Sequence, residues 1–455
     1  MTAAVELTSA RAPGPRYRNP LRLLRDLQEG GLDFPAKLFD RYGPVVEVRT
    51  YPRSMFWIKS PTALRQVLFT NGDNYTKGNL FDRLRVVGGN GMFFTDGEIW
   101  LRSKRIIGPY FRRHNMKNYV DALVAAGNKC NEEISDNYEG RECNVDRLMP
   151  LVALDVVGKA FFGMDIPAER ITALAQAVTN VGELGMQQMY SVVAAPWMPT
   201  ELKRRGMRSV KAVYETIDEL ITAGLARPKG DDLLSQLLDN VRSGELSRAQ
   251  LREELWTIVN AGHETTATTM AVMLYHLGKD QSWQAEVAAQ IDEVLQGGDP
   301  TFEMLGQLSK LDWTAHETLR LYPSASGTAR QALADDEVDG FFVPKGSIVQ
   351  ASFHWLHRDP QFWEDPDEFR PERFAVADKS TTNAYMPFGG GARRCLGEHF
   401  AYLEALIIVT KILQRFRVEA QDDFVVEPYM AVATRMRNGV QVTLRDRTKI
   451  YQQSR

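Results

Sequence analysis

Hydrophobic and polar positions follow a strand-like alternation early in the chain and change to a helical spacing further on. Residues 45–59 carry β-branched and aromatic side chains on both sides of a Tyr-Pro-Arg-Ser break, which predicts a β-hairpin. From about residue 98 to about residue 322 the apolar positions recur with helical spacing. A strand- and turn-like segment then precedes a last helix, over about 397–414, and a final pair of short strands. The pattern predicts a mainly α protein with small β-sheets.

One predicted helix is much longer than the others. Ser247 and Gln250 form a capping box, and no proline interrupts the chain from there to about Lys279. At a rise of 1.5 Å per residue, such a helix spans about 48 Å and crosses a whole domain. No repeat or composition break marks a linker, so we expect a single domain over 1–455. Within it we expect a helical core at about 98–322 and 397–414 and a β-rich flank at about 40–70 and 335–350.

Composition narrows the class of protein. The 455 residues are 44% hydrophobic and 25% charged, and the formal net charge is −3. This is a globular composition without the basic excess of a nucleic-acid-binding protein. The first twenty residues contain no apolar stretch long enough for a signal or an anchor. Three irregularly spaced cysteines fit a reducing compartment. We therefore expect a cytoplasmic monomer without a membrane anchor.

The segment before the last helix suits a metal-binding thiolate. Residues 388–397 read Phe-Gly-Gly-Gly-Ala-Arg-Arg-Cys-Leu-Gly. A cysteine at a helix N-terminus meets unpaired amide N–H groups and the positive end of the helix dipole, and both favour the thiolate form. Gly397 would let a flat group approach closely. A single buried cysteine is more often a small hydrophobe, and Cys130 and Cys143 are interpreted in that way.

A polar cluster interrupts the middle of the long helix. Residues 261–266 read Ala-Gly-His-Glu-Thr-Thr. A glycine inside a helix costs about 0.5–1 kcal/mol relative to alanine, and threonine hydroxyls compete for backbone hydrogen bonds. We therefore expect a bend or a widened groove at this point. A solvated polar patch would be the ordinary explanation of such a cluster taken alone.

A third set of segments completes an ordered pattern. Glu317 and Arg320 lie at positions i and i+3, which is common in surface ion pairs. Leu-Tyr-Pro, His-Arg-Asp-Pro and Phe-Arg-Pro-Glu-Arg-Phe follow, at 321–323, 357–360 and 369–374. Together with the cysteine segment and the Ala-Gly-x-Glu-Thr-Thr helix, they resemble the motifs of the cytochrome P-450 superfamily. The resemblance extends over most of the chain, from the early hairpin to the last strands, and it implies the P-450 fold with a long central helix over a buried haem.

The resemblance implies a haem b cofactor and a set of residues that hold it. Cys395 corresponds to the axial iron ligand, and Phe388 would pack beside its sulfur. Arg393 and Arg330 would bind the haem propionates. The family's Trp-x-x-x-Arg pattern corresponds to Trp100 followed by Lys104 and Arg105, and which of these two cations reaches a propionate is left open. Ala261 and Gly397 would leave room for the haem.

The resemblance also implies catalytic and structural roles. Thr265 would hydrogen-bond the iron-bound oxygen, and Glu264 would relay protons. His263 is treated as structural. Glu317, Arg320 and Arg373 would form a network that locks the fold.

The implied activity is that of a bacterial-type monooxygenase that hydroxylates or oxidatively couples a medium-sized lipophilic substrate, such as a terpenoid, a fatty acyl chain or an aromatic natural product. The expected lining of its pocket is Phe81, Asn90, Met186, Met189, Ala261, Ser324, Ser326, Met430 and Thr434. Electrons would come from a separate ferredoxin or flavodoxin with its reductase. The expected docking face is basic and comprises Arg102, Lys104, Arg105, Arg393 and Arg394.

Two alternative functions remain. One is a peroxygenase, isomerase or dehydratase of the same fold, and the other is a haem-binding sensor without turnover. Members of the first group generally lack the acid–alcohol pair of Glu264 and Thr265, and a sensor has no need for a proton relay. The presence of the pair therefore favours the monooxygenase.

Overall fold

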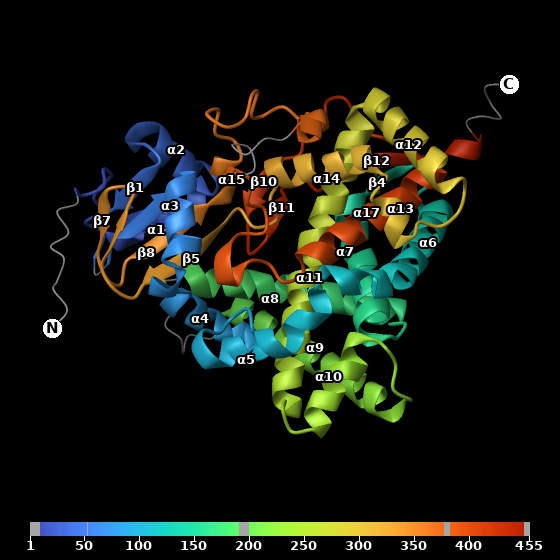
Figure 1. The fold of residues 1–455 in the computed structure, drawn as a ribbon, viewed down its shortest axis with the longest axis horizontal. Helices are drawn as coiled ribbons and strands as arrows, with labels where there is room; N and C mark the ends of the chain where they lie inside the picture. Colours follow the sequence, from blue (N-terminus) through green and yellow to red (C-terminus); the bar gives the residue numbers. More distant parts are fainter. Residues whose placement is uncertain (1–9, 52, 191–199, 377–382, 450–455) are drawn as a thin grey trace.

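The computed structural model describes residues 10–51, 53–190, 200–376 and 383–449, and the side chains of Met189 and Tyr190 lie outside the described part. Helices make up most of the molecule, and a smaller β-rich region lies at one end (Figure 1). This arrangement confirms the predicted fold class. Among the described helices, none is both long and apolar enough to cross a lipid bilayer.

The helices begin earlier in the chain than the sequence pattern predicted. Residues 20–42 form two helices whose buried leucines and phenylalanines pack against the first strands in a small separate core. The helices are α1 Pro20–Gly30, α2 Asp33–Tyr42, α3 Pro61–Arg65, α4 Gly78–Gly88, α5 Gly97–Ile107, α6 Val120–Asn137, α7 Val145–Val156, α8 Ala168–Tyr190, α9 Glu201–Ala226, α10 Leu233–Arg242, α11 Arg248–Lys279, α12 Gln281–Leu295, α13 Phe302–Leu305, α14 Ser309–Leu321, α15 Phe353–Leu356 and α17 Glu398–Arg415.

The largest sheet combines strands from both ends of the chain in the order β1-β2-β8-β5-β3. The predicted hairpin is confirmed, because β1 pairs with β2 in antiparallel register from Val45 opposite Ile58. The bounds are β1 Val45–Val48, β2 Met55–Ile58, β3 Tyr75–Thr76, β5 Gly327–Ala332 and β8 Ile348–Ser352. The remaining strands form three small sheets: β6 Asp336–Val338 with β7 Phe341–Val343, β10 Pro428–Met430 with β11 Thr434–Met436, and β4 Glu142–Asn144, β12 Gln441–Asp446 and β9 Phe416–Glu419.

The long helix α11 passes through the middle of the molecule (Figure 1). Its start confirms the predicted capping box: Gln250 N donates to Ser247 Oγ and Ser247 N donates to the Gln250 side chain, both at 3.1 Å. Because α7, α9, α14 and α17 all pack on it, nearly every residue from Thr266 to Leu277 is buried. The helix therefore forms the axis of the main hydrophobic core.

The expected weak point of α11 keeps its helical hydrogen bonding. The run is helical without a break from Arg248 to Lys279. The hydroxyls of four threonines instead return to carbonyls one turn earlier: Thr265 to Ala261, Thr266 to Gly262, Thr268 to Glu264 and Thr269 to Thr265, at 2.7–3.2 Å. Such bonds satisfy hydroxyl groups inside an apolar core without other polar partners.

Candidate active site around Cys395

The loop that carries Cys395 is fitted closely to the rest of the protein. Gly389 and Gly391 have φ angles of +69° and +67°, in the region that favours glycine. A β-carbon on Gly391 would lie 1.7 Å from the Leu68 carbonyl oxygen, so no side chain is possible there. Cys395 N donates to the Phe388 carbonyl at 2.9 Å, which closes the loop just before α17.

The thiol of Cys395 faces an internal space. Its side chain is accessible, yet burial among protein atoms is the main cause that raises its pKa to about 11. Both observations hold for a group that lines a cavity inside the protein. The amides of Gly397 and Glu398 hydrogen-bond the sulfur and lower its pKa, as expected at a helix N-terminus. Burial outweighs them, and a metal ion bound at the sulfur would favour the thiolate form.

Three buried cations meet close to this loop. Arg393 forms an ion pair with Asp96 and stacks 3.8 Å over the ring of Trp100. Arg330, on β5, donates to Thr328 and to a backbone carbonyl, and burial lowers its pKa to about 10. Lys77 lies beside them, and burial followed by repulsion from Arg393 and Arg330 lowers its pKa well below the ordinary value. One carboxylate, Asp96, thus faces three cations.

The two cations of α5 that were candidates for a propionate, Lys104 and Arg105, lie elsewhere. Lys104 Nζ donates to the Ala392 carbonyl at 2.7 Å and lies 4.9 Å over the Trp100 ring, so it braces the cysteine loop from outside. Arg105 is exposed. Neither cation belongs to the group of Lys77, Arg330 and Arg393. No sequence motif indicated that Lys77 would join this group.

The centre of α11 opens toward a space inside the protein. Ala261 is exposed although the helix on both sides of it is largely buried. A β-carbon on Gly262 would have one neighbour within 4 Å among the described residues, a Val157 methyl at 3.9 Å. An accessible residue at this point of a largely buried helix indicates an opening beside it.

The acid–alcohol pair lies next to this opening. Glu264 forms an ion pair with Arg435 on β11, and both side chains are mostly buried. Thr265 Oγ1 donates to the Ala261 carbonyl at 2.7 Å, and the Thr265 carbonyl accepts from Ser324 Oγ at 2.9 Å. His263 is fully buried and burial lowers its pKa to about 4, so it is neutral at physiological pH and packs as a core residue.

Glu317, Arg320 and Arg373 come together in one buried network. Glu317 and Arg320 are completely buried and share two hydrogen bonds of 2.7 and 2.8 Å. Arg373 Nε donates to Glu317 at 3.0 Å. The remaining N–H groups of Arg320 donate to the carbonyls of His357, Pro366 and Glu368 at 2.6–3.0 Å. All five guanidinium donors therefore have acceptors, the condition for a tolerable buried arginine.

Comparison with known proteins agrees with this geometry. The family model described as Cytochrome P450 matches residues 13–441. The chain belongs to the cytochrome P450 family. It is 29% identical to "Cytochrome P450 97B2, chloroplastic" of Glycine max over 84% of this chain and 77% of that protein. It is 30% identical to "Cyclooctat-9-en-7-ol 5-monooxygenase" of Streptomyces melanosporofaciens, over 88% of this chain and 86% of that protein.

Solved structures give the same fold. A cytochrome P450DA haem domain superposes with a TM-score of 0.84 at 24% identity and covers 96% of this chain and 98% of that domain. Membership of the family makes this chain a P450 monooxygenase, an oxidoreductase whose haem iron is held by a cysteine thiolate. P450 enzymes draw electrons from a redox partner and act on lipophilic substrates.

The residues around Cys395 fit a haem. A β-carbon on Gly397 would have no neighbour within 4 Å among the described residues, so open space lies beside the loop. Within the same part of the chain, the buried Arg393 Nη1 has no hydrogen-bond partner. Arg330, Arg393 and Lys77 lie in a mostly buried region where they meet one carboxylate, Asp96, so the anionic propionates of a haem would find cationic partners there. A buried excess of positive charge is costly until anions pair with it.

The predicted substrate-lining residues of this P450 differ in their burial and in their hydrogen bonds. Phe81 is buried, and its ring lies 4.6 Å from the Lys77 ammonium, while Met186, Ser326 and Met430 are partly buried. Ser324 and Thr434 direct their hydroxyls to the carbonyls of Thr265 and Pro323. Asn90 is exposed and accepts from Arg85. The side chain of Met189 lies outside the described residues.

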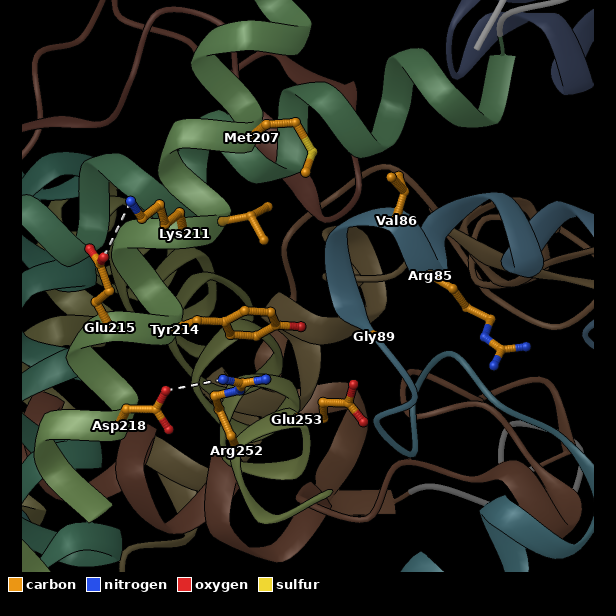
Figure 2. Close-up of a pocket in the computed structure, with 11 residues that line it drawn as sticks. Arg85, Val86, Gly89, Met207, Lys211, Tyr214, Glu215, Asp218, Arg252 and Glu253 are labelled. Atoms are coloured by element: carbon orange, nitrogen blue, oxygen red, sulfur yellow. Dashed lines mark hydrogen bonds and ion pairs between the residues drawn. The ribbon is translucent and has the colours of Figure 1, made fainter. Parts of the chain in front are cut away.

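A separate cleft of about 500 Å³ opens between α4, α9 and α11. Figure 2 shows Tyr214 and Glu253 pointing into it from α9 and α11, with Val86 of α4 and Gly89, just after α4, on the other side. Arg252 pairs with Asp218 at 3.1 Å along one wall. None of its lining residues is a predicted catalytic or haem-binding residue, so the chemistry of this P450 lies elsewhere.

Three residues near the site escaped the sequence analysis. Lys77 and Asp96 join the cation group, and Arg435 pairs with Glu264. Lys77 and Arg435 reach their partners across long sequence separations, and no local motif marks any of the three.

Proposed function

We propose that Cys395 ligates the haem iron and that this P450 oxidises a terpenoid substrate in the space beside Ala261. One observation carries the proposal: Ala261 is accessible at the centre of a buried helix, while Cys395 is the only accessible thiol among the described residues. Cys130 and Cys143 are buried, and burial raises the pKa of the Cys143 thiol to about 12. A haem with a thiolate ligand supplies O–O bond cleavage.

Glu264 and Thr265 move protons in this proposal. The Thr265 hydroxyl, held by the Ala261 carbonyl at 2.7 Å, is positioned to turn toward the opening and donate a hydrogen bond there. Glu264 is held by Arg435, which keeps its carboxylate at the edge of the site. Release from Arg435 would let it exchange protons with water and with the interior.

The terpenoid class has two kinds of support. The expected lining is mixed, with apolar side chains among polar ones, and it includes flexible methionines, which adapt to large rigid hydrocarbons. Among the relatives, one is named cyclooctat-9-en-7-ol 5-monooxygenase and another, 27% identical over 93% of this chain, is named carotene epsilon-monooxygenase. Carotene is a terpenoid hydrocarbon. A role in secondary metabolism follows from this substrate class.

We further propose a small acidic electron carrier, a ferredoxin or a flavodoxin with its reductase, as the redox partner. Arg102, Arg105 and Arg394 are exposed and lie on α5 or next to Cys395 in sequence. Arg393 has to be removed from the docking face that the sequence suggested, because its side chain turns inward to Asp96 and Trp100. Attraction between this surface and an acidic carrier weakens with salt.

A binding titration tests the substrate class. Terpenoid hydrocarbons and alcohols, fatty acids and aromatic polyketides are added in turn to the purified haem protein, and displacement of iron-bound water is followed by the spin-state shift of the Soret band. We expect terpenoids to give the shift and to be oxygenated only with O₂ and an electron donor. A shift with fatty acids alone would contradict the proposal.

Two leucine variants locate the site. Ala261→Leu fills the opening and should abolish the terpenoid shift. Ala223→Leu, on an exposed position of α9, adds the same volume elsewhere and should leave it unchanged. An unchanged shift in Ala261→Leu would place the substrate elsewhere.

A further inference from the structure

A histidine and two tyrosines form a hydrogen-bonded cluster behind the cysteine loop. The hydroxyl of Tyr402 on α17 lies 2.7 Å from Nδ1 of His316 on α14. The hydroxyl of Tyr385 lies 3.0 Å from the same nitrogen, 3.1 Å from the His316 carbonyl and 3.2 Å from the Tyr402 hydroxyl. Neither the haem contacts nor the proton path to Glu264 uses this cluster.

One arrangement of hydrogens satisfies the cluster. A neutral imidazole accepts one hydrogen bond at its unprotonated nitrogen. Tyr402, at the shorter distance, donates to Nδ1, and Tyr385 donates to the His316 carbonyl. The proton of the ring then sits on Nε2, which lies 3.6 Å from the Asp312 carboxylate. The Asp312 side chain is 42% exposed, so the ring lies between the Tyr402 hydroxyl and a carboxylate that reaches solvent.

Tyr402 also lies next to the loop that carries the cysteine. Its ring centroid is 5.3 Å from that of Phe388, and the Phe388 carbonyl accepts the Cys395 amide at 2.9 Å. Tyr402 is five residues past Gly397, the N-cap of α17, which at 1.5 Å per residue is roughly 8 Å along the axis. A phenol is thereby held close to the sulfur side of the haem site.

The acid–base state of the pair fits a coupled transfer. Burial raises the pKa of the Tyr402 phenol well above its ordinary value, so the hydroxyl keeps its proton. Burial lowers the pKa of His316, so the ring is neutral and can accept one. A phenol becomes a strong acid only when it loses an electron, and at that moment a base already lies within hydrogen-bond distance.

We propose that Tyr402, with His316 as its proton acceptor, is a redox-active tyrosine that drains oxidising equivalents from the haem-thiolate centre when no substrate reacts. The oxidant is that centre after reaction with peroxide or with reduced oxygen, and it gains one electron. Tyr402 loses this electron, its O–H bond breaks, and the proton forms an N–H bond at Nδ1 of His316. The products are a neutral phenoxyl and an imidazolium beside Asp312. The inference rests on Cys395 as the iron ligand.

The cluster continues away from the haem site. The ring of Tyr385 lies 6.2 Å from that of Trp363, a buried tryptophan whose indole N–H has no hydrogen-bond partner among the described residues. Tyr402, Tyr385 and Trp363 thus form a row of oxidisable side chains. Electron transfer from its neighbours can reduce the Tyr402 radical, which moves the oxidised site away from the cysteine ligand.

The radical itself is the readout. The substrate-free haem protein is mixed with peroxide, frozen within milliseconds and examined by electron paramagnetic resonance, with signals normalised to haem content. We expect a tyrosyl signal that narrows when the protein carries ring-deuterated tyrosine and that forms more slowly in D₂O. Absence of any tyrosyl signal would overturn the proposal.

Three variants assign the signal. Tyr402→Phe removes the phenol and should abolish most of the signal, whereas Tyr138→Phe, a partly buried tyrosine at the end of α6, should leave it intact. His316→Asn keeps a hydrogen-bond acceptor near the position of Nδ1 but cannot take the proton, so it should also lose the signal. An undiminished signal in Tyr402→Phe or in His316→Asn would overturn the assignment.

A separate spectrum distinguishes failure of the redox-tyrosine proposal from failure of the Cys395 assignment. Each variant is reduced and exposed to CO, and the strongly red-shifted Soret band of thiolate ligation is recorded. A normal band with a lost radical in Tyr402→Phe and His316→Asn supports the redox tyrosine. Loss of that band in the unmodified protein would contradict the proposed function instead. Faster haem bleaching by peroxide in Tyr402→Phe than in Tyr138→Phe is the expected consequence.

Discussion

Two buried acids in different regions of this P450, Glu317 and Glu254, are held in different ways. On the sulfur side, formed by residues 388–397 with α14 and α17, Glu317 is paired with Arg320 and Arg373 and every donor has an acceptor. On the oxygen side, formed by α11 and its neighbours, Glu254 is almost as deeply buried, and its hydrogen-bond donors are the Ser103 hydroxyl at 2.5 Å and the Met92 amide at 3.0 Å.

The difference separates two tasks. The ion pairs of the sulfur side fix the backbone that carries the iron ligand, and such a network tolerates no missing member. On α11, Glu264 has an ion-pair partner in Arg435, while Glu254 accepts from the Ser103 hydroxyl and the Met92 amide. Proton transfer needs groups that can change their charge. We therefore expect substitutions on the sulfur side to cause loss of haem, and substitutions on the oxygen side to change proton binding or proton transfer.

The largest effect is expected at Arg320. Arg320→Ala leaves Glu317 buried with one cation fewer and opens three backbone carbonyls, at a cost of about 3–5 kcal/mol. We expect loss of haem incorporation, measured as the haem-to-protein ratio of the purified protein. Arg370→Ala removes a half-exposed arginine that pairs with Asp365, and it should keep the ratio. Full haem content in Arg320→Ala would contradict the role of the network.

Glu254 should make stability depend on pH. Burial raises its pKa from 4.5 to about 7. Below pH 4.5 the carboxyl group is neutral in both the folded and the unfolded protein. As the pH rises to about 7 only the unfolded chain ionises freely, so the free energy of unfolding falls by about 3 kcal/mol, because a tenfold change in proton affinity corresponds to about 1.4 kcal/mol.

Urea unfolding of Glu254→Gln, repeated across this pH range, checks that loss. The variant should lose most of the slope of stability against pH, while Glu253→Gln, whose side chain faces the outer cleft in Figure 2, should retain it. An unchanged slope in Glu254→Gln would show that this acid is not the source.

A smaller effect is expected at Glu264. Glu264→Gln keeps the size of the side chain and removes its ability to exchange a proton, so product formation should fall by about 10²-fold. Haem content and the CO spectrum should not change, and more of the consumed electrons should appear as peroxide. The ratio of product to electron donor consumed measures this. Equal coupling in Glu264→Gln and in the unmodified enzyme would exclude Glu264 from the proton path.

The smallest effect is expected at the surface. Arg105→Gln removes an exposed cation of α5 and should slow reduction by an acidic carrier severalfold at low salt, with the difference vanishing at high salt. Stopped-flow reduction at several ionic strengths measures it. Arg208→Gln changes an exposed cation of α9 and should have no effect. The same rate loss in both variants would exclude a local docking face.

Local sequence patterns predicted the parts of this protein that depend on local chemistry. Ser247 and Gln250 marked the start of α11 correctly, and the break at 51–54 marked the hairpin between β1 and β2. The segment around Cys395 was recognisable because its whole pattern from Phe388 to Gly397 resembles the signature of the P450 family. Each of these signals needs only neighbours within a few residues.

Contacts between distant segments were beyond the same patterns. Lys77 meets Arg330 and Arg393 only through packing of the sheet against the cysteine loop, and Tyr402 meets His316 only because α14 packs on α17. The choice between Lys104 and Arg105 depended on the direction of each side chain from α5, and Lys104 reaches a backbone carbonyl. Asn90 stays a prediction for the substrate pocket, and its exposed amide accepts a hydrogen bond from Arg85.

The identity of the sulfur ligand is the central claim, and one spectrum tests it most directly. The reduced, CO-bound form of Cys395→Ser is compared with Cys130→Ser and Cys143→Ser, which change the two buried thiols. The strongly red-shifted Soret band of thiolate ligation should disappear in Cys395→Ser and remain in the other two variants. Persistence of that band in Cys395→Ser, or its loss in either control at full haem content, would contradict the account.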